Sequence, residues 1–167
     1  MRLARSARRG FTILEVATVA VILGIAAATA VPFLKEARWR AELREVTKKV
    51  AADLANARAL ARSGRSNFEG WSRRTRLRRA GLRFTGARSY EVYVDGNRRA
   101  DGVREVTLQT VGLEPWVQLV PSTSELRFRR NGTLQDTTTF SVTVRDARSD
   151  RDTVLEVAYG GAVRVRR

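Results

Sequence analysis

Nineteen consecutive uncharged, mostly apolar residues, 16–34, follow the segment RRGFTILE at positions 8–15. A helix from Phe11 to Leu34 would be about 36 Å long, at about 1.5 Å per residue, which is enough to cross a bilayer. Glu15 stands at the start of this run. An ionised side chain at the centre of a membrane helix costs about 2.5 to 3.5 kcal/mol on insertion scales, so Glu15 should have a partner or a function.

Two general classes of N-terminal segment share part of this pattern. A secretory signal peptide combines a basic start, an apolar stretch and a small-residue cleavage site. The sequence offers arginines within residues 2–9 and the small-residue segment Ala28-Thr29-Ala30. A simple signal anchor would account for the length of the apolar run. Neither class accounts for Gly10, Phe11 and Glu15 together.

These residues resemble the N-terminus of type IV pilins and pseudopilins. In that family a short basic leader ends in Gly, a prepilin peptidase cuts between Gly and Phe, and the new N-terminus is methylated. The resemblance implies processing and N-methylation at Gly10 and Phe11, an assembly role for Glu15 and a helix-bending role for Pro32. It also implies three partners: other pilins or pseudopilins in a filament, the prepilin peptidase, and inner membrane lipid.

The chemistry of these positions suits assembly. Cleavage before Phe11 would create an α-amine with a pKa of about 7.7 to 8.0, one helical turn from Glu15. Glu15 could neutralise the amine of its own chain or that of a neighbour. The resemblance implies the neighbour, and this pairing would fix axial register because an unpaired Glu is costly in an apolar core. Pro32 lacks an amide hydrogen and should bend or loosen the helix between Gly24 and Pro32.

Charge indicates the topology. The leader arginines favour a cytoplasmic N-terminus, which places the chain beyond Leu34 in the bacterial periplasm. We expect a single-pass inner membrane protein that later enters a pilus or pseudopilus. Removing the leader lowers the formal net charge from +15 to +11. The chain has no cysteine, so no disulfide stabilises the part beyond the membrane.

Hydrophobic periodicity extends the helix beyond the membrane. We expect a leader over 1–10, a long helix over 11–64 and a β-rich globular domain over 65–167. Within the helix, 11–34 would span the membrane and 35–62 would be amphipathic. Apolar residues recur there three or four positions apart, as in a half-buried helix: Trp39, Leu43, Val46, Val50, Leu54, Ala57 and Ala61. Ser63 and Gly64 supply the helix end.

In the remainder of the chain, the spacing of apolar residues changes from that of a helix to the alternation typical of strands. Six segments alternate or are rich in β-branched residues: 90–94, 105–108, 116–120, 126–128, 140–144 and 154–157. The amphipathic helix needs a sheet to cover its apolar stripe. The sequence therefore predicts an α+β, pilin-like fold, in which a long N-terminal helix packs against a C-terminal antiparallel β-sheet domain.

Three downstream segments resemble the FimT/GspH group of minor pilins and minor pseudopilins. They are 56–63 at the helix end, 92–101 as a hairpin rich in Asp, Gly and Asn, and 160–167 as a closing strand. The expected function is therefore structural. The chain would be a minor pilin or minor pseudopilin in a type IV pilus or a type II secretion pseudopilus.

The same resemblance implies an alternative, a membrane-anchored DNA-binding minor pilin that acts in DNA uptake. Some FimT-like minor pilins bind DNA through a C-terminal Gly-Arg-x-Arg motif. Here Gly161 is followed by Ala162, and only Arg164 of the motif's arginines is present. Possible polyanion contacts are Arg164, Arg166 and Arg167 in the tail and Arg73, Arg74 and Arg76 upstream. A guanidinium suits phosphate, but a solvated basic face needs no ligand.

Metal binding and catalysis have little support in the sequence. Asp95, Asn97 and Asp101 offer oxygens at alternate positions in a Gly-containing loop, as in calcium sites. Arg99 and Val106 occupy positions that need ligands in an EF-hand-like loop, so an ordinary turn is the simpler interpretation. The chain has no His and no Cys, and so lacks the commonest general base and metal ligands. We expect neither an enzyme nor a cofactor.

Overall fold

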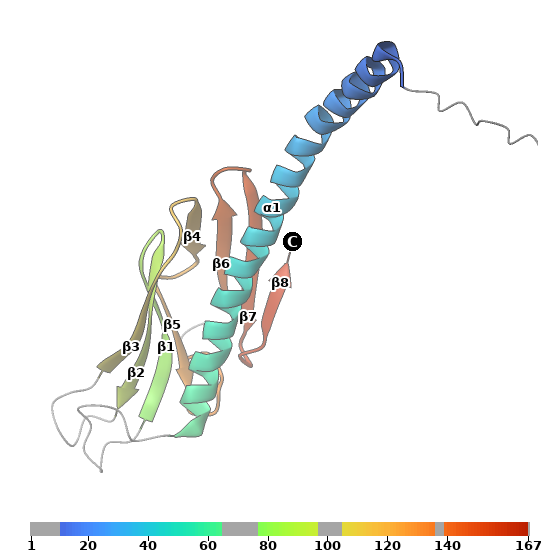
Figure 1. Ribbon diagram of the computed structural model, residues 1–167. Helices are drawn as coiled ribbons and strands as arrows, with labels where there is room; N and C mark the ends of the chain where they lie inside the picture. The colour runs from blue at the N-terminus through green and yellow to red at the C-terminus, as the bar shows by residue number, and fades with distance from the viewer. Residues whose placement is uncertain (1–10, 65–76, 97–104, 136–138, 167) are drawn as a thin grey trace, which may run out of the picture. The chain divides into compact units, whose positions relative to one another are not determined.

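The computed structural model describes residues 11–64, 77–96, 105–135 and 139–166. In chain order, the described residues form one helix followed by eight strands (Figure 1). They are α1 (Ile13–Ser63), β1 (Leu77–Gly86), β2 (Ser89–Gly96), β3 (Glu105–Gly112), β4 (Val117–Pro121), β5 (Glu125–Arg129), β6 (Thr139–Asp146), β7 (Arg151–Ala158) and β8 (Val163–Arg166). The chain forms two compact units, one ending at Ala41 and one beginning at Glu42, so α1 contributes to both.

The first unit contains the apolar part of α1. The helix continues without interruption past Pro32, and its large apolar side chains are exposed. Ile13 is 92% exposed and Phe33 is 68% exposed. Among the described residues, α1 is the one helix long and apolar enough to cross a membrane by length and composition.

The second half of α1 is amphipathic, as the sequence predicts. The residues of α1 that are buried recur at helical spacing: Leu43, Thr47, Val50, Leu54, Ala57 and Ala61. Val46 packs against the same core, and Trp39 lies in the first unit and is half-buried. The helix ends at Ser63, and Gly64 has a φ of 62°, the left-handed conformation that commonly follows a helix.

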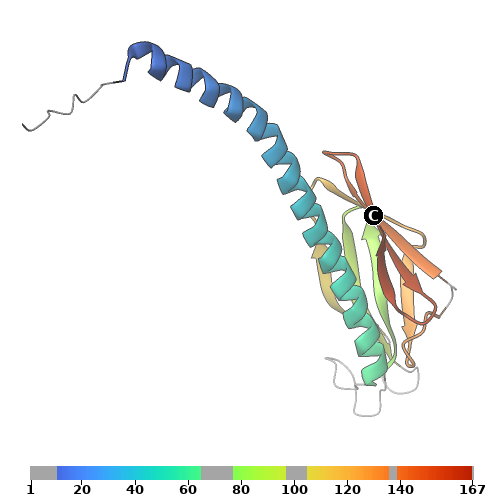
Figure 2. The same ribbon diagram turned by 90° about the vertical axis from the view of Figure 1, so that its right-hand side faces the viewer.

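The strands form two antiparallel sheets, whereas the sequence predicts a single sheet domain without a strand order. Sheet A has the order β3-β2-β1-β5, and sheet B has the order β4-β6-β7-β8. In β6, the buried positions alternate with partly exposed ones, as expected of a strand with one face on a core. Buried residues of α1 and of both sheets form one hydrophobic cluster, and Figure 2 shows the second half of α1 running alongside the strands.

All six predicted strand segments coincide with strands of the structure, from β2 to β7, and β8 confirms the closing strand. Strand β1 was missed. Its arginines at positions 78, 79 and 83 mask the alternation of Leu77, Ala80, Leu82 and Phe84. Asp95 and Gly96 end strand β2 rather than form a turn, and Asn97 lies outside the described residues.

Candidate assembly site

The apolar half of α1 forms an exposed hydrophobic surface in the first unit. Its exposed side chains include Ile13, Leu14, Val16, Val19, Val21, Ile22, Leu23, Ile25, Val31, Phe33 and Leu34. Two threonines within it hide their hydroxyl groups by donating to backbone carbonyls. Thr18 Oγ1 donates to Leu14 O at 2.8 Å, and Thr29 Oγ1 donates to Ala26 O at 3.0 Å. This surface therefore exposes almost no unsatisfied polar group, as a segment buried in lipid or among apolar helices must.

Glu15 belongs to the first turn of α1, and Thr12 caps that turn. The backbone N–H of Glu15 lies 3.2 Å from Thr12 Oγ1 and 3.1 Å from Thr12 O. Thr12-Ile13-Leu14-Glu15 matches the pattern of a capping box, a signal that sequence reasoning missed. Glu15 is thus also a carboxylate at the positive end of the helix dipole. Phe11 precedes the helix, and Gly10 lies outside the described residues.

Gly24 and Pro32 both lie within α1. A Cβ added at Gly24 would meet nothing within 4 Å, so no close contact within the chain requires a glycine there. The proposed bend between these residues stays a prediction. Beyond Leu34 the helix becomes charged: Lys35 Nζ lies 5.0 Å from the centre of the Trp39 ring, and Arg40 pairs with Glu36 at 2.8 Å.

The predicted polyanion contacts are only partly described. Arg164 is exposed on β8, and Arg166 pairs with Glu156 of β7 at 3.0 Å. Arg73, Arg74, Arg76 and Arg167 lie outside the described residues. The DNA-binding alternative therefore stays a prediction.

The candidate calcium residues are also mostly undescribed. Asp95 ends β2, while Asn97 and Asp101 lie outside the described residues. Burial raises the pKa of the Asp95 carboxyl, against the attraction of Arg79. The parts of the chain that the structure describes hold no group of three acidic residues that could bind a metal ion.

The three segments that suggested the FimT/GspH resemblance are not equally described, but two of them meet at Arg58. This side chain projects from α1 and donates through Nε to Gly132 O at 3.2 Å and through one Nη to Gly160 O at 2.6 Å. Gly132 and Gly161 both have left-handed backbone, with φ values of 80° and 79°. A Cβ added at Gly161 would lie 2.3 Å from Gly132 O and 2.5 Å from Arg58 Nε. One arginine therefore holds two turns, and each turn requires a glycine.

A second ionic cluster connects α1 with the end of β6. Asp146 is a completely buried carboxylate, which accepts hydrogen bonds from Nε and an Nη of Arg148, each at 3.1 Å. Arg148 also pairs with Glu42 of α1 at 2.8 Å and lies 3.7 Å from the centre of the Trp116 ring. Burial alone would raise the pKa of Asp146, but the hydrogen bonds from Arg148 outweigh burial and lower it.

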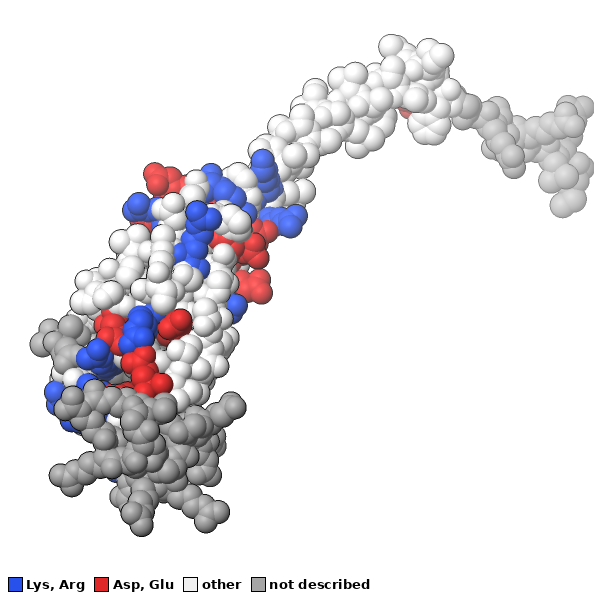
Figure 3. Space-filling model, turned by 90° about the vertical axis from the view of Figure 1, so that its left-hand side faces the viewer, with Lys and Arg blue, Asp and Glu red and all other residues white. Residues whose placement is uncertain are grey.

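The outward side of sheet A carries an ionic network of its own. Arg83 of β1 pairs with Glu105 of β3 at 2.5 Å and with Glu125 of β5 at 3.1 Å, and Arg127 also contacts Glu125. On the face of the molecule in Figure 3, acidic and basic side chains lie beside one another on the sheets. The charges of Arg83 and Arg127 are thus locally neutralised by Glu105 and Glu125.

Comparison with known proteins identifies the fold. No protein-family model matches the chain, and no curated protein matches it. Two crystal forms of the type IV minor pilin FimU from Pseudomonas aeruginosa strain PAO1 match in structure. One is 20% identical with a TM-score of 0.57, and the match covers 77% of this chain and 90% of FimU. The other is 18% identical with a TM-score of 0.54, covering 74% and 92%. The chain therefore has a type IV pilin-like fold.

Proposed function

We propose that this protein is a structural subunit of a type IV pilus or a type II secretion pseudopilus. The observation that carries the proposal is the division of α1. Its first half exposes large apolar side chains, whereas its second half supplies core residues to the two sheets. One helix is thus both an integral part of a folded domain and an apolar segment that needs an external partner.

Two environments suit the apolar half of α1. As a precursor, the chain is anchored in the inner membrane through residues 11–34, with its second unit in the periplasm. After cleavage between Gly10 and Phe11, the same surface packs against the corresponding helices of other subunits. Both environments remove the apolar side chains from water, at about 25 cal/mol for each Å² of apolar surface.

Glu15 gives the assembly its register. The structure of one chain supports a capping role for Thr12 and a place for Glu15 beside the helix N-terminus, where a carboxylate is favourable. In a filament, Glu15 pairs with the Phe11 amine of a neighbouring subunit. A subunit shifted along the axis would leave Glu15 unpaired among apolar groups, which is costly.

Glu15→Ala tests this function in a strain that assembles filaments. We expect the variant to accumulate in the membrane but to fall at least about tenfold in sheared filaments, measured by quantitative immunoblotting. Glu45→Ala is the matched control, because Glu45 is exposed on the same helix beyond the apolar run. Equal incorporation of both variants would contradict the role of Glu15. Absence of the wild-type chain from both pili and pseudopili would contradict the proposed function.

A further inference from the structure

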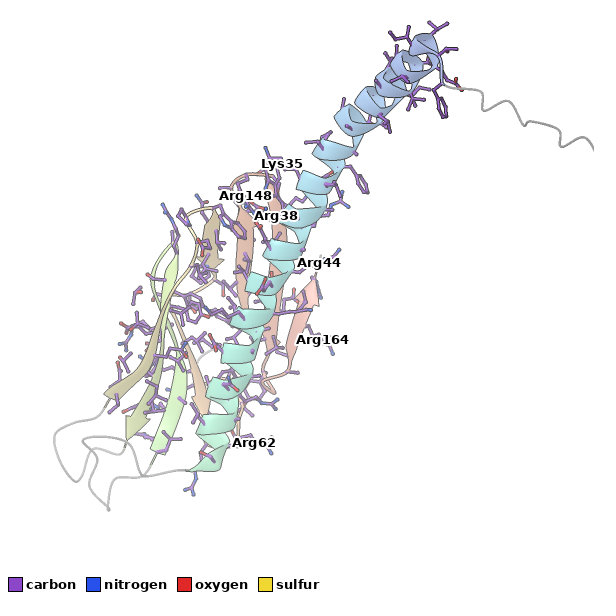
Figure 4. The ribbon with its side chains drawn as sticks, viewed as in Figure 1. Lys35, Arg38, Arg44, Arg62, Arg148 and Arg164 are labelled. Carbon is purple, nitrogen blue, oxygen red and sulfur yellow. The ribbon has the colours of Figure 1, made fainter. Side chains whose placement is uncertain are left out.

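A groove of about 570 Å³ lies between α1 and sheet B, lined by Arg44, Thr47, Lys48, Thr153 and Val165. Arg44 and Lys48 form its helical wall, one turn apart. Thr153 comes from β7, and Val165 comes from β8, the terminal strand of its sheet. Figure 4 shows Arg44 on α1 and Arg164 on β8. We refer to this feature as the α1–β8 groove.

The α1–β8 groove combines positive charge with an uncovered apolar surface. None of the described residues that line it is acidic. Two cations four positions apart on a helix repel each other and destabilise it by about 0.2 to 0.5 kcal/mol. On the strand side of the groove, Val165 of β8 is 52% exposed although it pairs in register with the buried Leu155. A ligand that supplies carboxylates and a small apolar side chain would satisfy both features.

We propose that the α1–β8 groove binds an extended acidic segment of a different subunit in the same filament. This inference rests on the proposed role of the chain as a filament subunit. Strand β8 lines the groove and is the terminal strand of sheet B among the described residues, and terminal strands accept extended segments readily. Carboxylates of the segment pair with Arg44 and Lys48, while an alternating apolar side chain covers Val165.

Charge favours a different subunit over a second copy. Without residues 1–10 each chain has a formal charge of +11, so copies repel one another at long range. Two of the acidic residues on α1 are already engaged within the chain. Glu42 pairs with Arg148 at 2.8 Å, and Asp53 accepts a hydrogen bond from the Tyr90 hydroxyl at 2.6 Å. The same positive charge that disfavours self-association should make an acidic partner associate faster and more specifically.

A protein segment also suits the groove better than nucleic acid does. A duplex presents a regular row of phosphates and is bound by extended sets of cations. The α1–β8 groove instead offers only two cations, together with two threonines and an exposed valine, and such a mixture of apolar and polar groups is typical of protein interfaces.

The test measures peptide binding to the full chain in detergent micelles by fluorescence anisotropy. The probes are a labelled octapeptide of alternating Glu and Val, its Lys and Val counterpart, and a 12-base-pair DNA duplex. We expect the acidic peptide alone to bind at low salt, with at least about tenfold weaker binding by R44E/K48E. The milder R44Q/K48Q should weaken binding less, and R88E is the matched control because Arg88 is exposed in the β1–β2 turn.

Three outcomes would overturn the inference: no binding of the acidic peptide, equal binding by R44E/K48E and R88E, or DNA binding that R44E/K48E abolishes. Circular dichroism of each variant checks that it is folded. The peptide assay contains no filament, so its failure is distinguishable from failure of the proposed function. A chain that enters filaments but does not bind the peptide contradicts this inference alone.

Discussion

At the scale of single residues, Arg58 connects α1 with two turns that are distant in the sequence. Its two carbonyl partners lie 74 and 102 positions away in the sequence. They belong to the turn after β5 and to the turn between β7 and β8. Through these contacts Arg58 positions β8, and with it Arg164 and Val165 of the α1–β8 groove.

We predict that Arg58→Ala lowers the free energy of unfolding by about 1.5 to 3 kcal/mol, the usual value of a hydrogen bond from a charged group. Arg58→Lys should recover only part of this loss, because an ammonium cannot reproduce the guanidinium fork. Thermal unfolding of the full chain in micelles, followed by circular dichroism, measures the effect. Lys49→Ala, exposed on the same helix, is the control. Loss of the same size in both alanine variants would rule out the proposed role of Arg58.

At the scale of elements, the cluster of Glu42, Asp146 and Arg148 fastens α1 to the β6–β7 turn. Asp146 occupies an inward position of β6, after Phe140, Val142 and Val144. A carboxylate at that position is tolerated because Arg148 satisfies both of its oxygens. The buried carboxylate of Asp146 therefore favours one packing arrangement between the end of β6 and α1, the one in which Arg148 reaches both Asp146 and Glu42.

This cluster predicts a dependence of stability on pH. The folded-state pKa of Asp146 is lowered, so its stabilisation is complete above the unfolded value of about 3.9 and disappears as pH falls through the lower folded value. Unfolding experiments between pH 7 and pH 2 should show a loss of stability below about pH 4. Asp146→Asn should be less stable at pH 7 and show a shallower acid dependence.

Asp150→Asn is the control for this prediction. Asp150 is exposed, and its φ of 49° is a conformation that Asn adopts readily. Its acid profile should match that of the wild type. If Asp146→Asn also retains the wild-type profile, the acid dependence belongs to other pairs, such as Asp152 with Arg145, whose hydrogen bond lowers the pKa of Asp152.

At the scale of the whole molecule, the fold could be predicted because its main element is a local pattern. The spacing from Leu43 to Ala61 defines a helix without knowledge of any distant contact, and alternation identifies most strands. The division into two sheets could not be predicted, since strand order depends on pairings far apart in sequence. Strand β1 was missed because three of its ten residues are arginines, at positions 78, 79 and 83, which interrupt the apolar pattern of its buried residues.

The candidate site was also only partly predictable, because contacts between residues far apart in the sequence cannot be deduced from spacing. The apolar run and Glu15 lie next to each other in the sequence, so their relation could be deduced from spacing. The partners of Arg58 and Asp146 are set by tertiary packing, and no spacing indicates them. The contact that Gly132 and Gly161 share with Arg58 could be found only in the structure.

In the proposed function, the apolar half of α1 becomes an assembly helix after the chain is processed between Gly10 and Phe11. Mass spectrometry of the N-terminal peptide, after coexpression with a prepilin peptidase, would detect this processing. We expect a chain that begins at Phe11, carries a methyl group on its α-amine and is absent when the peptidase is omitted. A chain that keeps residues 1–10 in the presence of the peptidase, or one cut after Ala30 as in a signal peptide, would contradict the account.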